Sequence, residues 1–290
     1  MIVSMTGFGK AAGQFEGKKL TVEIKSLNSK QGDFIVRMPS VYKEKELVFR
    51  TLLANLLHRG KIELSIYSES NGEESQHTFN KELAINYYNE LKEVAEAIGQ
   101  ESQDYLAQIV RMPDVLKVER PELKEDEAKF LQDLIEEAIE QVNGFRKQEG
   151  EKLQQDFNQR IVSILSLLKE VEKHDPKRIE GIRERITKNL EEILTPDKAD
   201  YNRHEQELIY YIEKLDITEE KVRLKAHCDY FMETMEKSKT QGKKLGFIAQ
   251  EIGREINTIG SKANYAEIQR AVVQMKDELE KIKEQVLNVL

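Results

Sequence analysis

The chain has 290 residues, of which 34% are charged and 39% are hydrophobic, and its mean hydropathy is −0.61. This composition supplies enough apolar material for a core and favours long solvated helices. No run approaches the roughly 18 apolar residues of a transmembrane helix, and the single cysteine, Cys228, excludes an intrachain disulfide or a cysteine-based zinc cluster.

The amino-terminal residues show no basic stretch followed by a long apolar run. No signal peptide is therefore expected, and a cytoplasmic location without membrane association is the simplest interpretation.

The net charge of −8 is unevenly distributed. Residues 1–70 carry an excess of Lys and Arg, residues 71–200 carry most of the acidity, and Lys237–Lys262 holds six basic and two acidic residues. Because attraction to phosphate depends on local basic surface, a polyanion could contact the two ends and avoid the middle. The alternative is that these charge runs are solvated helix faces.

The first 70 residues predict a small mixed sheet packed on one side by a helix. Leu20–Ile24 and Ile62–Ile66 alternate apolar and polar residues, as half-buried strands do, and Asp33–Met38 is a third candidate strand. Tyr42–Leu57 has leucines at helical spacing, and Gly60 is expected to end that helix.

The remainder of the chain predicts helices almost throughout. The polar Asn71–Ser75 segment is expected to be a linker, Glu125–His174 to form one long helix or two, and Pro176 to restart the chain in a helix that ends at Leu194. The other expected helices are Lys81–Ile98, Asp104–Arg111, Tyr201–Leu215, Thr218–Met235, Leu245–Ile259 and Ala266–Val289.

These elements predict an α+β fold, in which a small N-terminal mixed α/β sheet domain is followed by a long, mainly helical region. We expect an N-terminal domain at 1–75, an acidic helical middle region at 76–200, and a C-terminal helical domain at 201–290 that carries the functional site. Long apolar stripes on an acidic surface favour an oligomer, and helix pairing within one chain is the alternative.

One predicted helix carries a polar stripe. Asp216, Glu220, Arg223 and His227 lie 0, 4, 7 and 11 residues along, so that about 100° per residue brings them within roughly 60° of one another. If Asp216 or Thr218 is instead the N-cap, Asp216 leaves the stripe. An exposed ladder of ion pairs is the alternative interpretation.

A second polar face contains Glu251 and Glu255, four residues apart, and is bordered by Gln250, Arg254 and Asn257. Like charges at this spacing oppose helix formation by a few tenths of a kcal/mol, unless a divalent cation or Arg223 from the other helix compensates. Carboxylates with a histidine suit Mg²⁺ or Mn²⁺ better than a structural zinc.

Common nucleotide and nucleophile motifs are absent from the sequence. Gly260-Ser261-Lys262 lacks the rest of a phosphate-binding loop, and Gly7–Lys10 is not followed by the helix signal of a dinucleotide fold. Cys228 lacks the context of a nucleophile and is expected to be a packing thiol.

Six short segments, spread in order over the whole chain, form a specific combination. They are Ser4–Lys10, Leu27–Lys30, Arg59–Glu63, Arg146–Gly150 with Asp156, Asp216–His227, and Gln250–Lys262. Together they resemble the YicC/YloC family of bacterial endoribonucleases. The chain departs from the family pattern where Lys30-Gln31-Gly32 replaces an arginine and bulky apolar residues, and where Gly246 and Gly253 replace an acidic residue and an asparagine.

The resemblance implies a cytoplasmic, RNA-cleaving enzyme that depends on a divalent metal, Mn²⁺ or Mg²⁺, and assembles as a ring or clamshell, expected to be a homo-hexamer. The bound metal would polarise the scissile phosphate and lower the pKa of bound water, and the nucleophile is either water or the ribose 2′-hydroxyl. The expected metal ligands are Asp216, Glu220, His227, Glu251 and Glu255. Besides His227, the expected catalytic residues, which offset transition-state charge, are Arg223, Arg254 and Lys262. The residues expected to hold single-stranded RNA are Lys30, Arg59, Lys61, Lys243 and Lys244.

Two other functions are compatible with the residues alone. The first is a non-catalytic RNA-binding or adaptor protein, in which the carboxylate stripes are structural ion pairs. The second is a helical scaffold with no role in RNA metabolism.

Overall fold

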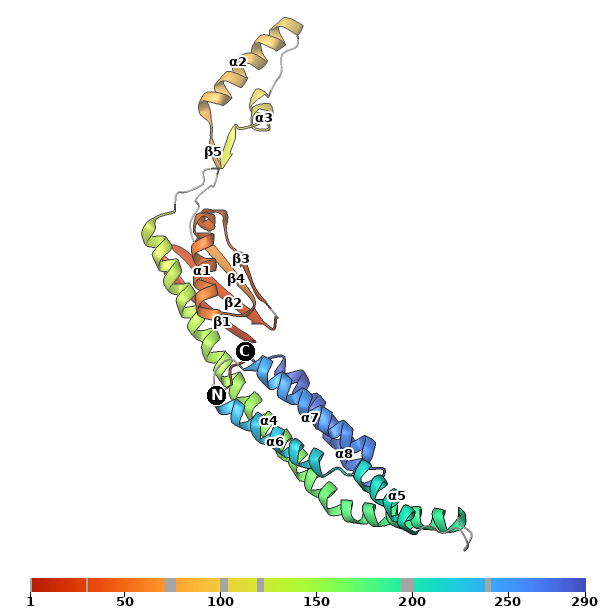
Figure 1. Cartoon of the computed structure of the whole chain (residues 1–290). Coiled ribbons are helices and arrows are strands. Elements are labelled where there is room, and N and C mark those ends of the chain that lie inside the picture. The colour runs from red at the N-terminus through yellow and green to blue at the C-terminus, as the bar shows by residue number, and fades with distance from the viewer. Residues whose placement is uncertain are drawn as a thin grey trace.

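The computed structural model shows an elongated molecule organised along one long helix (Figure 1). The structure describes residues 2–29, 31–70, 77–99, 104–118, 123–193, 201–237 and 241–290. A small sheet lies between a short helical module and a helical bundle, which confirms the predicted α+β fold. Within these residues, no helix is both long enough and apolar enough to cross a lipid bilayer.

The N-terminal sheet has the strand order β1-β2-β4-β3. Its strands are β1 (Gly7–Phe15), β2 (Lys18–Leu27), β3 (Gly32–Arg37) and β4 (Gly60–Ser70). Strands β1, β2 and β4 pair antiparallel, whereas β3 pairs parallel to β4 and reaches it through a 3₁₀ turn (Ser40–Lys45) and helix α1 (Glu46–Leu57). Gly60 does not end α1 as expected, because His58 caps that helix and Gly60 opens β4.

Strand β1 was not predicted, because all of its core-facing residues before Phe15 are small. Gly7, Gly9, Ala11 and Gly13 alternate along it, and this side faces helix α4 (Glu125–Ile193). A Cβ atom at Gly9 would overlap the carbonyl oxygen of Ala138 on α4. The small residues therefore let the helix backbone lie directly against the edge of the sheet.

A short module follows the sheet. It consists of β5 (His77–Phe79) paired antiparallel with β6 (Leu116–Val118), together with α2 (Lys81–Ile98) and α3 (Tyr105–Ile109). Helix α2 has the predicted bounds, whereas the two-stranded ribbon was not predicted. The expected linker at Asn71–Ser75 lies outside the described residues.

Helix α4 is continuous over 69 residues, so the expected restart at Pro176 is wrong. A proline inside a helix removes one backbone hydrogen bond, but neighbouring contacts hold this segment in place. The buried carboxylate of Asp175 accepts from Arg178 Nε at 2.9 Å and from Lys221 Nζ at 2.7 Å, and Arg178 also donates to the Leu215 carbonyl at 3.0 Å. These bonds tie α4 to the chain that leads into the next helices.

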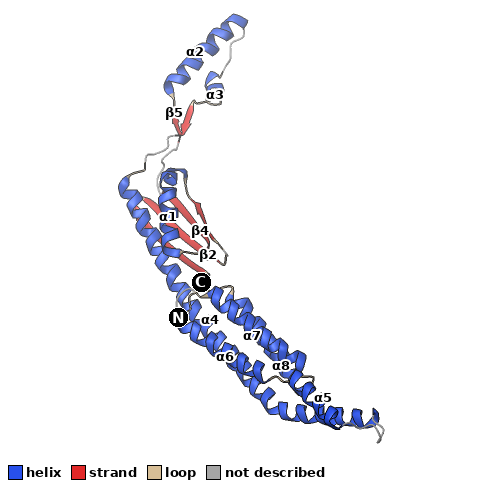
Figure 2. Ribbon diagram, in the orientation of Figure 1, coloured by secondary structure: helices blue, strands red, loops and turns tan. Residues whose placement is uncertain are grey.

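The C-terminal half of α4 packs with three further helices into a bundle (Figure 2). These are α6 (Thr218–Lys237), α7 (Gly242–Lys262) and α8 (Ala266–Val286), and α5 (Tyr201–Lys214) lies beside the far end of α4. Their apolar faces share one core, in which Phe157 meets Phe231 edge to face. Because Leu131–Val142 belongs to the sheet core and Phe157–Val171 to the bundle core, α4 is common to both.

The guanidinium of Arg146 occupies the junction between sheet and bundle. It donates to the Leu57, Met5 and Arg59 carbonyls at 3.1, 3.5 and 3.3 Å and to Ser26 Oγ at 2.6 Å. Burial away from water lowers its pKa to about 10, so it stays charged at neutral pH. Beside it the chain ends meet, through the Ser4–Val289 bridge and the Leu290 amide on the Val3 carbonyl.

We expect Gly9→Ala to destabilise the fold by at least about 2 kcal/mol, because a methyl group there must push α4 away from β1. Gly144→Ala is the matched control: Gly144 is an exposed α4 residue whose Cβ would meet no neighbour, so alanine should stabilise the protein by up to about 1 kcal/mol. Urea unfolding followed by circular dichroism measures both changes. Equal effects of the two substitutions would contradict the close approach of helix and strand.

We expect Arg146→Met to lower the free energy of unfolding by at least about 2 kcal/mol, since it leaves several buried oxygen acceptors without a donor. Relief from burying the charge offsets part of this loss. Arg50→Met removes an exposed arginine that pairs with Glu46, so a change within about 0.5 kcal/mol is expected. Urea unfolding followed by circular dichroism measures both changes. Equal urea midpoints for Arg146→Met and Arg50→Met would show that the junction does not depend on the guanidinium.

Candidate metal centre

The candidate site lies where α6 and α7 pack together. Each helix turns apolar residues into the shared core, including Leu224 and Phe231 from α6 and Ile252 and Ile256 from α7. Three polar contacts mark the order along this interface: Lys244 with Tyr230, His227 with Glu251 and Glu255, and Lys262 with Glu220. The pairing shows that the two helices run antiparallel.

His227, Glu251 and Glu255 converge at the middle of the α6–α7 interface. One nitrogen of the imidazole and one oxygen from each carboxylate all lie within 4.8 Å of one another. The two glutamates share a face because they are four residues apart on α7, and the histidine reaches them from α6. His227 is half-buried, Glu251 is exposed and Glu255 is buried.

Among the described residues, protein cations balance the charge of this cluster only in part. Glu255 is only 5% exposed, and within the described chain its carboxylate has neither an ion pair nor a hydrogen bond. The only basic partner of Glu251 there is Arg254, whose Nη1 lies 3.8 Å away on an exposed side chain. Two carboxylates beside an imidazole are a donor set that fits Mn²⁺ or Mg²⁺, because a cation would relieve their repulsion and satisfy the buried Glu255.

The structure places Glu220 and Asp216 apart from this cluster. The buried Glu220 Oε1 accepts from Lys262 Nζ at 2.7 Å, and the same ammonium group donates to the Asp216 carbonyl at 3.0 Å. Asp216 precedes the first helical residue of α6 by two positions, and its carboxylate accepts from the Thr218 hydroxyl at 2.8 Å. At 1.5 Å per residue, Glu220 is about 10 Å from His227 along the helix.

Two expected catalytic arginines have exposed carboxylate partners. Arg223 pairs with Glu219, one turn earlier on α6, rather than crossing to the glutamates of α7. Arg254 lies beside the cluster through its contact with Glu251. Of the expected catalytic residues, the structure therefore places His227 in the cluster and Arg254 at its edge, while Lys262 pairs with Glu220.

The expected RNA-binding residues occupy two regions. Arg59 and Lys61 lie at the start of β4, where Arg59 Nε donates to the Ser29 carbonyl at 3.3 Å and Lys61 is exposed. Lys243 and Lys244 begin α7; Lys243 is exposed, and Lys244 Nζ sits 4.8 Å from the centre of the Tyr230 ring. Lys30 lies outside the described residues.

The two glycine departures from the family pattern face α8 rather than the cluster. A Cβ atom at Gly253 would approach Leu279 at 3.1 Å, and one at Gly246 would approach Val286 at 3.7 Å. The family's side chains at these positions would therefore point into the α7–α8 interface.

Sequence reasoning missed the network that fixes the N-terminal end of α6. Lys221, one residue after Glu220, donates to Asp175 of α4, which also binds Arg178. The i, i+3 spacing of Asp175 and Arg178 was the only sequence signal for it, and Lys221 carried none. Cys228 is buried beside this interface, and burial together with the nearby charge of Asp229 raises its pKa to about 12, as expected of a packing thiol.

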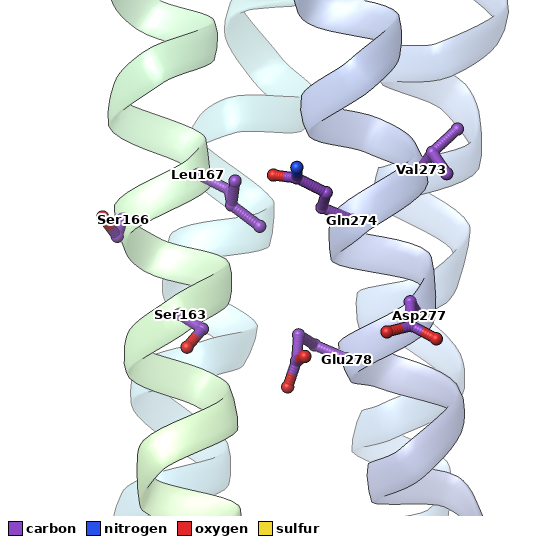
Figure 3. Close-up of a pocket in the computed structure, with 7 residues that line it drawn as sticks. All are labelled: Ser163, Ser166, Leu167, Val273, Gln274, Asp277 and Glu278. Atoms are coloured by element: carbon purple, nitrogen blue, oxygen red, sulfur yellow. The ribbon is translucent and has the colours of Figure 1, made fainter.

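A separate groove of about 550 Å³ lies between α4 and α8 (Figure 3). Figure 3 shows Ser163 and Leu167 on α4 opposite Gln274 and Glu278 on α8. Its acidic residues already have basic partners, because Glu278 pairs with Arg160 at 3.0 Å and Asp277 pairs with Lys281 at 2.6 Å. The groove therefore lacks the uncompensated charge that distinguishes the His227 cluster.

Comparison with known proteins decides the family. Residues 2–155 match the family model described as "Endoribonuclease YicC-like, N-terminal region", and residues 171–290 match "Endoribonuclease YicC-like, C-terminal". The chain belongs to the YicC-like endoribonuclease family. YicC-like relatives named "Probable endoribonuclease YicC" occur in Clostridioides difficile and Haemophilus influenzae, and are 34% and 30% identical to this chain over the full length of both proteins compared.

Mn²⁺ is expected to raise the melting temperature of the protein relative to EDTA, because a ligand that binds only the folded state adds about 2.7 kcal/mol at a hundredfold excess over its Kd. Glu255→Gln should abolish this increment. Glu220→Gln is the matched control: it lowers the starting melting temperature by leaving Lys262 unpaired, yet should retain the increment. Loss of the increment in Glu220→Gln alone would move the ion to the Glu220 end of the interface.

Proposed function

We propose that this chain is an endoribonuclease that cleaves phosphodiester bonds in single-stranded RNA and depends on Mn²⁺ or Mg²⁺ held by His227, Glu251 and Glu255. The observation that carries the proposal is the convergence of these three side chains from two helices around an uncompensated negative charge. Membership of the YicC-like family and the names of both relatives support the cleavage of RNA.

In this proposal, some residues of the cluster bind the ion and a neighbouring residue contacts the substrate. Glu251 and Glu255 would supply carboxylate oxygens to the ion, and His227 would supply a ring nitrogen. An ion held there would supply Lewis acidity to the scissile phosphate and would make a nearby water more acidic. Arg254, at the edge of the cluster, is placed to offset negative charge on the phosphate oxygens.

The ion pair between Lys262 and Glu220 positions this machinery from one end. It joins the C-terminal turn of α7 to the first turn of α6 and thereby supports the register of the two helices, which their shared apolar core also holds. Since His227 comes from one helix and both glutamates come from the other, a change of register would separate the ligands. Lys262 therefore has a positioning role in the proposal, and Asp216 contributes its backbone carbonyl to this contact.

The substrate side of the proposal rests on basic residues near the junction of sheet and bundle. Arg59 and Lys61 flank Gly60, where β4 begins, and Lys243 and Lys244 follow Gly242, where α7 begins. The Gly242 amide donates to the Leu290 carbonyl beside the chain ends. Contacts of this kind hold the phosphate backbone with little sequence preference and weaken with salt.

The proposal includes a homo-oligomer, and specifically the homo-hexamer that the family resemblance implies. Large apolar side chains remain exposed on three helices. Val273 of α8, which lines the α4–α8 groove, is 64% exposed, Val162 of α4 is 58% exposed, and Ile98 of α2 is 66% exposed. Exposed apolar surface of this kind is typical of protein interfaces. Light scattering after size-exclusion chromatography measures the mass of the assembly.

Cleavage of a fluorescent single-stranded RNA tests the enzymatic function. With Mn²⁺ the wild-type protein is expected to cut it, with EDTA it is not, and His227→Ala and Glu251→Ala should each lower the rate at least about a hundredfold, because they remove a ligand of the ion. Glu236→Ala, an exposed carboxylate on α6, is the matched control and should cleave like wild type.

The same assay separates the enzyme from an adaptor. Binding of RNA without cleavage under any divalent ion, with purified protein of the expected oligomeric state, would support the non-catalytic alternative. Wild-type turnover in both His227→Ala and Glu251→Ala would remove the cluster from the mechanism.

A further inference from the structure

A second concave site lies at the end of the sheet beside Arg146, where β1, β2 and β4 meet α4. It has a volume of about 430 Å³, and its apolar lining is formed by Phe8, Leu27 and Phe145. These side chains are 43%, 56% and 45% exposed, although all three lie on regular elements beside the buried junction. The fold therefore leaves two phenyl rings and a leucine exposed to solvent next to one another. Grouped exposed apolar side chains of this kind are typical of binding sites.

Two lysines border this apolar lining. Lys25 is paired in register with Phe8 across β1 and β2, and Lys61 is paired with Leu27 across β2 and β4. Within the described residues neither ammonium group has an acidic partner, even though Lys25 is in register with Glu63. The two acids at the same site, Glu63 and Glu149, are already paired with Arg37 at 3.1 Å and Lys152 at 3.4 Å.

The site also gathers sequence segments that the metal cluster does not use. Phe8, Leu27, Lys61 and Glu149 each come from a different one of the segments on which the family resemblance rests. Arg146 lies directly beneath the site, since it donates to Ser26, which is also part of the lining. The backbone around the pocket is therefore held by a buried hydrogen-bond network rather than by loose loops.

Aromatic rings flanked by unpaired lysines match the chemistry of a nucleotide. A base presents a flat π face for stacking on a phenyl ring, and the phosphates on either side of it attract ammonium groups. A surface that pairs with a second protein copy has the opposite tendency, because lysine is depleted where protein interfaces are buried. The charge pattern thus favours RNA over a subunit contact.

We infer that this pocket is a base-stacking subsite for single-stranded RNA, in which Phe8 and Phe145 contact one nucleobase and Lys25 and Lys61 contact the adjoining phosphates. The inference rests on the proposed function only in taking RNA as the ligand. It does not depend on the metal cluster, because the pocket shares no residue with it.

Binding in EDTA tests the subsite without cleavage. The probes are a short fluorescent single-stranded RNA and the same strand with its bases removed at consecutive positions, both titrated with the full-length protein. Phe8→Ala and Phe145→Ala are each expected to weaken binding of the intact strand by about tenfold, the range that loss of one stacked base produces. Binding of the abasic strand should change less than twofold in both variants.

The lysines should behave differently from the rings. Lys25→Ala and Lys61→Ala are expected to weaken binding of both strands, and each should reduce the slope of log Kd against log salt by about 1. Tyr67→Ala is the matched control: Tyr67 is an aromatic residue of β4 that is 50% exposed but lies outside the pocket, so both affinities should stay at wild-type values.

Phe8→Leu keeps the apolar volume without the aromatic ring and guards against a folding artefact. If it binds the intact strand as weakly as Phe8→Ala and melts like wild type, stacking is supported. Wild-type affinity of Phe8→Ala and of Phe145→Ala for intact RNA would overturn the inference. If these two variants also changed the mass of the oligomer, the pocket would be assigned to a subunit interface. If the wild-type protein and every pocket variant failed to cleave RNA with Mn²⁺ while the wild type still bound RNA as expected, only the proposed function would be contradicted.

Discussion

The buried guanidinium of Arg146 is the contact on which the arrangement of sheet and bundle depends. It carries several fixed donors in one plane and can therefore bind acceptors from different segments at once, which a lysine ammonium cannot reproduce. Its acceptors come from the N-terminal segment, β2, and the α1–β4 connection. No carboxylate neutralises it among the residues described, so three backbone carbonyls and the Ser26 hydroxyl compensate for the loss of water around it.

The small residues of β1 complement this contact. Gly7, Gly9 and Gly13 bring the sheet edge against α4 so closely that the helix serves as a wall of the sheet core before it enters the bundle. Sequence patterns revealed the strands whose buried faces are large and apolar, such as Leu20–Ile24, but not β1, because a buried face of glycine and alanine lacks apolar periodicity. The helix restart expected at Pro176 was wrong for a related reason. Asp175 and Arg178, which keep α4 continuous, form contacts with residues far along the chain, and a local sequence pattern does not reveal such contacts.

The cluster of His227, Glu251 and Glu255 shows how much of a site helical periodicity can predict. Spacing put Glu251 and Glu255 on one face of a helix and His227 in a polar stripe, and the structure brings these three together. The sequence spacing also predicted on which side of its helix Glu220 lies, but it could not predict which residue of the other helix Glu220 contacts. Because α6 and α7 are antiparallel, a residue near the start of α6 meets the end of α7, where Lys262 is, while His227 meets the middle.

This antiparallel order also explains why a small cation, rather than a lysine, suits the cluster. On either side of it one ammonium group is already engaged, Lys262 by Glu220 and Lys244 by the face of Tyr230. The repulsion between Glu251 and Glu255 is thus left in place at the middle of a well-packed interface, where the surrounding contacts hold both helices together against it. Negative charge maintained in this way is the feature on which the proposed binding of a divalent ion rests, and the exposed position of Glu251 leaves the cluster accessible from solution.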